Sequence, residues 1–128
     1  MRYLGIDYGE GRVGLALSDR DGSFAFPHAN YPNDGKLVDA IAALVLREGV
    51  AEIVVGDTLA DTGGRNPITA QSDVFAAALE RATGLPVRRT REAWSTHEAA
   101  RYAPADKKHD DSAAAAIILQ RYLDAKRA

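Results

Sequence analysis

The sequence predicts an α/β fold in which one mixed five-stranded sheet carries helices on both of its faces. Three strand-like segments come first and are separated by short glycine-containing turns, a pattern typical of an antiparallel meander. Apolar strand-like segments then alternate with amphipathic helical segments, which is the pattern of parallel strands joined by crossover helices. The length of 128 residues fits one domain over residues 1–128.

The antiparallel part begins at the N-terminus, with strands expected at Tyr3–Asp7, Arg12–Ser18 and Ser23–His28. Gly9, Gly11 and Gly14 are expected to supply positive φ angles or room for a close backbone approach around the first turn. Pro27 and Pro32 indicate that the third strand lies at a sheet edge, because proline cannot donate a hydrogen bond to a strand ladder.

The second part alternates between helix and strand. In chain order, the expected elements are helix Lys36–Glu48, strand Ile53–Gly56, loop Asp57–Arg65, a helix from Pro67 to Gly84, strand Leu85–Thr90, a short helix after Ser95, a basic loop Ala105–His109 and helix Asp110–Ala125. Gly49 is placed to cap the first helix. The second helix is expected to bury a stripe formed by Val74, Phe75, Ala78, Leu79 and Ala82.

Composition excludes several classes of function. The chain has no cysteine, so it can form neither disulfides nor thiolate metal sites, which agrees with a reducing cytoplasm. The formal net charge of −2 argues against a basic coat protein for nucleic acid, so nucleic-acid contacts have to come from local patches. No signal-peptide core or membrane-spanning stretch is recognisable, and a cytoplasmic location is expected.

Three acidic residues stand at the ends of predicted elements. Asp7 ends the first strand, Glu92 follows the last strand by two residues, and Asp111 opens the final helix. Such ends can share one edge of a mixed sheet, where α/β proteins place their ligands. Carboxylate oxygens suit a hard cation, Mg²⁺ or Mn²⁺, and a pair of such ions supports phosphodiester hydrolysis.

Each acid also has a purely structural interpretation. Asp7 fits a hairpin turn, Asp111 fits a helix N-terminus, and Glu92 fits a polar surface turn. Helix phase favours a role for Asp111, because the positions three, four, seven and eleven residues after it are largely apolar. Asp111 is therefore expected to point toward the sheet, and Asp110 toward solvent.

Basic residues lie close to the same acids in the sequence. They are Arg12, Arg88, Arg89, Arg91, Lys107 and Lys108. Their position predicts contacts with the phosphates of a nucleic acid on either side of a metal site. The alternative, a solvated surface with ordinary charges, stays open for each of them.

Four segments together resemble the YqgF/RuvX family, whose members are described as Holliday junction resolvases and as the nuclease that matures the 5′ end of pre-16S ribosomal RNA. The segments are Leu4–Gly9, Arg12–Asp19, Ile53–Gly56 and Asp111–Gln120. The resemblance implies one RNase H-like nuclease domain. It also implies that Asp7, Glu92 and Asp111 are the catalytic acids and hold one or two Mg²⁺ or Mn²⁺ ions.

The resemblance further implies partners. The expected substrates are branched DNA, precursor rRNA or both, and no interaction with a membrane is expected. A resolvase that cuts two symmetric strands would act as a homodimer. Arg91 and Ala93 depart from the Asp and Arg of the family's Asp-Glu-Arg-Leu-Thr-Thr motif. Asp57 stands where the family has leucine, so it is either a fourth metal ligand or the start of a loop.

Two other functions stay open from the sequence. A nucleotide-binding domain of the actin and sugar-kinase type also begins with an acid-ended strand and a glycine-rich hairpin, although such proteins close two domains over ATP and this chain predicts one. A non-catalytic nucleic-acid-binding module is the second, because Arg91 and Ala93 depart from the nuclease motif.

Overall fold

The computed structural model describes residues 1–58, 67–92 and 111–127. The strands are β1 (Arg2–Tyr8), β2 (Arg12–Ser18), β3 (Ala25–Pro32), β4 (Val50–Thr58) and β5 (Val87–Glu92), and the helices are α1 (Leu37–Glu48), α2 (Pro67–Thr83) and α4 (Asp111–Arg127). The sheet order is β3-β2-β1-β4-β5. β1, β2 and β3 pair antiparallel, whereas β1, β4 and β5 pair parallel. The predicted mixed five-stranded sheet is confirmed.

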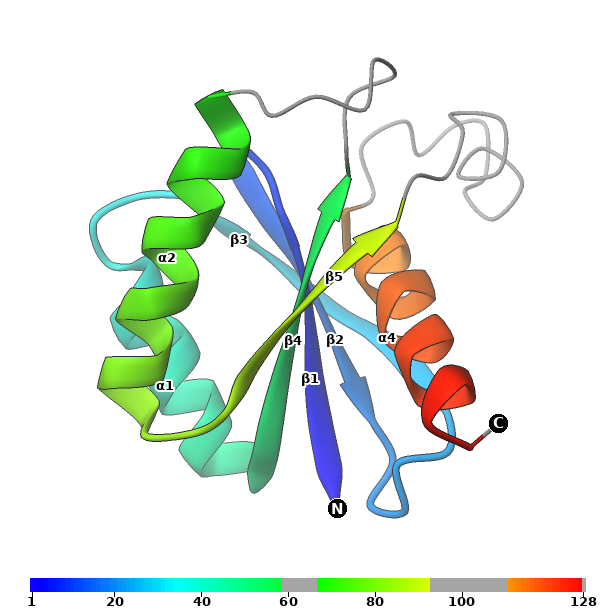
Figure 1. Ribbon diagram of the computed structural model, residues 1–128. Coiled ribbons are helices and arrows are strands. Elements are labelled where there is room, and N and C mark those ends of the chain that lie inside the picture. The colour runs from blue at the N-terminus through cyan, green and yellow to red at the C-terminus, as the bar shows by residue number, and fades with distance from the viewer. Residues whose placement is uncertain (59–66, 93–110, 128) are drawn as a thin grey trace.

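Helices cover both faces of the sheet, as predicted. α1 and α2 lie on one face and α4 lies on the other (Figure 1). Residues alternate between these faces along β1: Leu4 and Ile6 are buried in the core under α1 and α2, while Tyr3 is buried in the smaller core under α4. Gly5 and Asp7 therefore share the α4 face with Tyr3. In the described part of the chain, no helix is long and apolar enough to cross a membrane.

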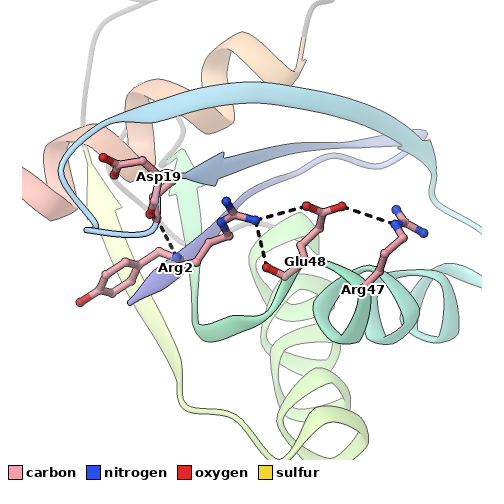
Figure 2. A network of polar contacts seen from close by, with 6 residues as sticks. Arg2, Asp19, Arg47 and Glu48 are labelled. Atoms are coloured by element: carbon pink, nitrogen blue, oxygen red, sulfur yellow. Dashed lines mark hydrogen bonds and ion pairs between the residues drawn. The ribbon is translucent and has the colours of Figure 1, made fainter.

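The C-terminal end of α1 is fixed to the start of β1. Gly49 adopts the left-handed conformation, with φ of 67°, and its N–H bonds the carbonyl oxygen of Val45, which confirms the predicted cap. Arg2 Nη1 donates to the Glu48 carbonyl oxygen at 3.0 Å and lies 3.3 Å from its carboxylate, which also contacts Arg47 (Figure 2). The Arg2 guanidinium thereby satisfies the Glu48 carbonyl group, one of the last carbonyl groups of the helix.

The third strand begins later than predicted, at Ala25 instead of Ser23. The Asp19 carboxylate accepts hydrogen bonds from the backbone N–H groups of Ser23 and Phe24, at 2.7 and 3.2 Å. Gly22 has φ of 71° in the same turn. These bonds keep residues 19–24 in a turn. The edge position that the prolines indicated is confirmed.

Two further predictions are corrected. β4 and β5 extend beyond their predicted ends, to Thr58 and Glu92, because their parallel pairing continues through the Thr58–Glu92 register. The predicted α2 stripe is shifted, since Val74 is 70% exposed and Ala82 is also exposed. The buried positions are Ser72, Phe75, Ala76 and Leu79, whose three-four spacing defines the stripe that packs on the sheet. The predicted short helix after Ser95 and the basic loop at 105–109 lie outside the described residues.

Candidate active site

The end of β1 and the start of α4 bring two of the predicted acids together. Asp7 pairs with Gly14 on β2 and with Gly56 on β4, so both of its sheet neighbours lack a side chain. Asp111 is the first residue of α4 and lies over Gly14. A Cβ at Gly14 would overlap the Asp111 carbonyl group and would lie 2.7 Å from the Asp111 Cβ. The missing side chain at position 14 therefore lets Asp111 approach Asp7.

Glycines on the three central strands hold α4 close to the sheet. A Cβ at Gly5 would lie 2.6 Å from the Leu119 Cβ, and one at Gly56 would lie 2.5 Å from Ile118 Cδ1. In the described part of the chain, positive φ is found only at Gly22, Gly49 and Gly84. The expectation of positive φ or close backbone approach is therefore met through close approach at Gly9, against the Arg12 backbone, and at Gly14. Gly11 shows neither feature, so the expectation is wrong there.

The environment of Asp7 disfavours its charged form. Burial, and then repulsion from the Asp111 carboxylate, raise the pKa of Asp7 from 3.8 to about 7. Arg12 Nε lies 3.4 Å from Asp111 Oδ2 and offsets part of the charge on that carboxylate. Two neighbouring carboxylates, one of them largely desolvated, form an oxygen-rich site whose electrostatics would favour a divalent cation.

The third predicted acid is only partly located. Glu92 is the last residue of β5 and pairs with Thr58, but its side chain lies outside what the structure describes, as does that of Arg91. Lys107, Lys108 and Asp110 also lie outside the described residues. Within residues 1–58, 67–92 and 111–127, no three His, Cys, Asp or Glu side chains are grouped closely enough to hold a metal ion.

Arg88 and Arg89 lie on opposite faces of the sheet. Arg88 Nε is 3.9 Å from the Glu52 carboxylate, which accepts a 2.7 Å hydrogen bond from Tyr122 of α4. Arg89 instead contacts α2, through Asp73 at 2.7 Å and the Ser72 hydroxyl at 3.0 Å. Arg88 therefore shares the face of Asp7. The structure gives Arg89 a role in fixing α2 to β5, on the face away from Asp7.

The strand register also bears on Asp57. Its position follows Ile53 and Val55 at two-residue spacing, and both of these residues are buried in the core under α1 and α2. By the alternation of a strand, position 57 therefore falls on the face of the sheet that is opposite to Asp7. The register gives no support to the interpretation of Asp57 as a fourth ligand.

Two features of the α4 face were not predicted from the sequence. Glu52 is a buried carboxylate. Burial of the Tyr122 hydroxyl, and then its hydrogen bond to Glu52 and the charge of Glu52, raise the pKa of Tyr122. Thr90 has a buried hydroxyl without a hydrogen-bond partner among the described residues. The only sequence signal for either residue is its place in the two-residue alternation of a strand, which becomes informative once the register is known.

Residues 1–125 match the family described as RuvX: Holliday junction resolvase. A protein from Leifsonia xyli subsp. xyli, named "Putative pre-16S rRNA nuclease", is 42% identical over 134 residues, and the alignment covers 98% of this chain and 86% of the relative. The T. thermophilus RuvC in complex with a Holliday junction substrate has a TM-score of 0.62 at 16% identity, covering 99% of this chain and 96% of that chain.

A fowlpox virus resolvase in complex with Holliday junction DNA has a TM-score of 0.61 at 12% identity, covering 98% of this chain and 99% of that chain. At these identities, the structural likeness establishes a RuvC-like, RNase H-like fold. The family match spans the strands and the final helix that place Asp7 and Asp111, and it decides for a nuclease over the nucleotide-binding alternative. The chain belongs to the RuvX family of Holliday junction resolvases and pre-16S rRNA nucleases.

Proposed function

We propose that this protein is a metal-dependent endonuclease that hydrolyses phosphodiester bonds in structured nucleic acid. The observation that carries the proposal is the convergence of Asp7 and Asp111, where burial and mutual repulsion raise the pKa of Asp7 to about 7. When both of these neighbouring carboxylates are ionised, their repulsion is costly unless a cation neutralises them. Asp7, Asp111 and Glu92 would hold one or two Mg²⁺ or Mn²⁺ ions.

The position of Glu92 on β5 agrees with its proposed role. Arg88 and position 92 are four residues apart on one strand, so the alternation of the strand places both positions on the same face of the sheet. Arg88 lies on the α4 face. Asp7 lies on that face as well. We infer that Glu92 completes the site from β5. A bound divalent cation would supply Lewis-acid stabilisation of charge at the phosphate and would promote ionisation of the attacking water.

The protein's own residues have separable roles in this mechanism. Asp7 has to be ionised to bind a cation, so cation binding and deprotonation of Asp7 are coupled. Arg12 offsets charge at Asp111 and is placed to contact a phosphate at the edge of the site. Arg88 is 58% exposed on the same face and is the second candidate for a phosphate contact. We also propose phosphate contacts for Arg91, Lys107 and Lys108. For Arg89 a phosphate contact is a secondary role, because its guanidinium group already contacts α2.

We propose two candidate substrates, each supported by one of the comparisons. The name of the 42% identical relative favours the 5′ end of pre-16S rRNA as the first substrate to test. The family description favours the four-way DNA junction as the second. A junction resolvase cuts two symmetric strands, so junction cleavage would require two copies of the chain.

The test compares cleavage of a pre-16S rRNA fragment and a four-way junction in Mg²⁺, in Mn²⁺ and in EDTA. We expect cleavage only with a divalent cation, leaving 3′-hydroxyl and 5′-phosphate ends. Asp7→Asn should abolish cleavage, and Asp39→Asn, at an exposed acid on α1, should not change it. Cleavage in EDTA, or full activity of Asp7→Asn, would contradict the mechanism. Binding without cleavage in every metal would favour the non-catalytic module.

A further inference from the structure

Three paired residues form one row across the sheet, from Asp7 on β1 through Gly56 on β4 to Thr90 on β5. Asp7 pairs with Gly56, and Gly56 pairs in turn with Thr90. Arg88, two residues earlier on β5, contacts Glu52 beneath α4, whereas Arg89 contacts α2. By this alternation, Thr90 lies on the α4 face together with Asp7. Two strand spacings of about 4.8 Å each separate their backbones. Gly56 between them has no side chain of its own, and the side chain of Ile118 on α4 packs over it.

Thr90 has a polar atom without a partner in this row. Its Oγ1 is buried and has no hydrogen bond within the described ranges 1–58, 67–92 and 111–127. The other two such side-chain atoms are Nε of Arg2 and Nε of Arg89, and both guanidinium groups form hydrogen bonds through their other nitrogens. Thr90 has only this one polar side-chain atom. A buried hydroxyl without a partner is costly, so its presence beside the site calls for an explanation.

We propose that Thr90 is a substrate-binding residue whose hydroxyl donates a hydrogen bond to a phosphate oxygen of the nucleic acid held at the Asp7 site. The proposal rests on the function proposed above and adds a contact from β5. Thr90 as a whole is only partly buried. Rotation about χ1 to another staggered rotamer would exchange its methyl and hydroxyl groups and turn the hydroxyl toward a ligand. Ile118, packed on Gly56, forms the apolar wall of the row on the α4 side.

The test uses two substitutions that separate the hydroxyl from the methyl group. Thr90→Val keeps the shape and removes the hydroxyl, and Thr90→Ser keeps the hydroxyl. Three quantities are measured: the melting temperature in EDTA, the dissociation constant for a pre-16S rRNA fragment in Ca²⁺, and kcat and KM with Mn²⁺. We expect Thr90→Val to have an unchanged or higher melting temperature, with dissociation constant and KM raised roughly tenfold or more, the size expected for a hydrogen bond to a charged group. Thr90→Ser should bind RNA within roughly threefold of the wild type.

Each other outcome overturns the proposal. Unchanged RNA binding and KM in Thr90→Val would show that the hydroxyl does not contact substrate. A clear drop in melting temperature of Thr90→Val would show that the hydroxyl has a structural partner, and equal losses in both variants would assign the effect to packing. The binding measurement needs no cleavage. It therefore tests Thr90 even if the wild-type protein fails to cut, a result that would count against the proposed function alone.

Discussion

Gly14 lies directly beneath Asp111, and a Cβ at position 14 would lie 2.7 Å from the Cβ of the aspartate. The first turn of α4 can approach the end of β1 only because β2 has no side chain at this point. A fold contact thereby sets the distance between two carboxylates, Asp111 above the sheet and Asp7 within it. The electrostatics of the site follow from this approach.

Gly14→Ala is expected to push the start of α4 away from the sheet. Overpacking of this kind costs about 1–3 kcal/mol of stability, and the displaced Asp111 should lower cleavage activity much further than the loss of stability explains. Gly11→Ala is the matched control, because a Cβ at Gly11 meets no atom within 4 Å. Chemical denaturation and cleavage rates below the melting temperature distinguish the two variants. Wild-type activity in Gly14→Ala would refute the required close approach.

Asp7→Asn should stabilise the metal-free protein at high pH. The pKa of Asp7 is about 7 in the folded state and 3.8 as its ordinary value, so the folded state holds this proton more tightly. The stability that the protonated group contributes is complete below pH 3.8 and has been lost once the pH exceeds about 7. At pH 8 in EDTA, the variant should therefore be more stable than the wild type by about 1–4 kcal/mol.

The same comparison at pH 4 provides the control for Asp7→Asn. There the wild-type carboxyl is largely protonated and resembles the amide, so the difference in unfolding free energy should become small. Saturating Mg²⁺ should also reduce the difference at pH 8, because the cation stabilises only the ionised wild-type site. A difference that is independent of pH would mean that Asp7 has an ordinary pKa.

Tyr122→Phe should destabilise the fold without reducing cleavage. The substitution removes the 2.7 Å hydrogen bond to the buried Glu52 carboxylate, at the start of the strands and far along β1 from Asp7. Among the described residues, the buried Glu52 carboxylate would then keep the 3.9 Å contact to Arg88 without the hydrogen bond from Tyr122, which should cost about 1–3 kcal/mol. Tyr31→Phe on the edge strand β3 is the control. Equal stabilities of the two variants in urea denaturation would contradict the assigned hydrogen bond.

Arg88→Gln and Arg89→Gln should have opposite effects. Arg88 is exposed on the face of Asp7, so its loss should weaken nucleic-acid binding and reduce the salt slope by about 1, with little change in stability. Arg89 is fixed to Asp73 and Ser72, so its loss should cost about 1 kcal/mol of stability and leave binding nearly unchanged. Binding titrations at several salt concentrations, with melting curves, test the pair. The reverse pattern would place Arg89 on the nucleic-acid surface.

Much of this architecture could be predicted because its determinants are local. The apolar stripe of α1 and the terminal Gly49 identify that helix, and the proline content of β3 identifies a sheet edge. The phase of α4 correctly pointed Asp111 toward the sheet, because Ala115, Ile118 and Leu119 are all buried. These patterns depend only on the repeat of a helix or on the chemistry of one residue.

The remaining features depend on register, which the sequence does not specify alone. The opposite orientations of Arg88 and Arg89, the alternation that separates Asp57 from Asp7, and the row that joins Asp7 to Thr90 all require the pairing of β4 with its neighbours. The role of Gly14 depends on a helix almost a hundred residues later in the chain. Likewise, β3 starts at Ala25, two residues later than predicted, because the Asp19 carboxylate accepts a hydrogen bond from the Ser23 N–H group and keeps this segment in a turn.

The most direct test of the central claim, that Asp7 and Asp111 form a cation site, is an NMR pH titration of the Asp7 side-chain carboxyl carbon with and without Mg²⁺. We expect a midpoint near pH 7 in EDTA and a shift of at least two pH units downward with saturating Mg²⁺, because the cation competes with the proton. A midpoint near 4 in EDTA, or one that Mg²⁺ does not move, would contradict the claim.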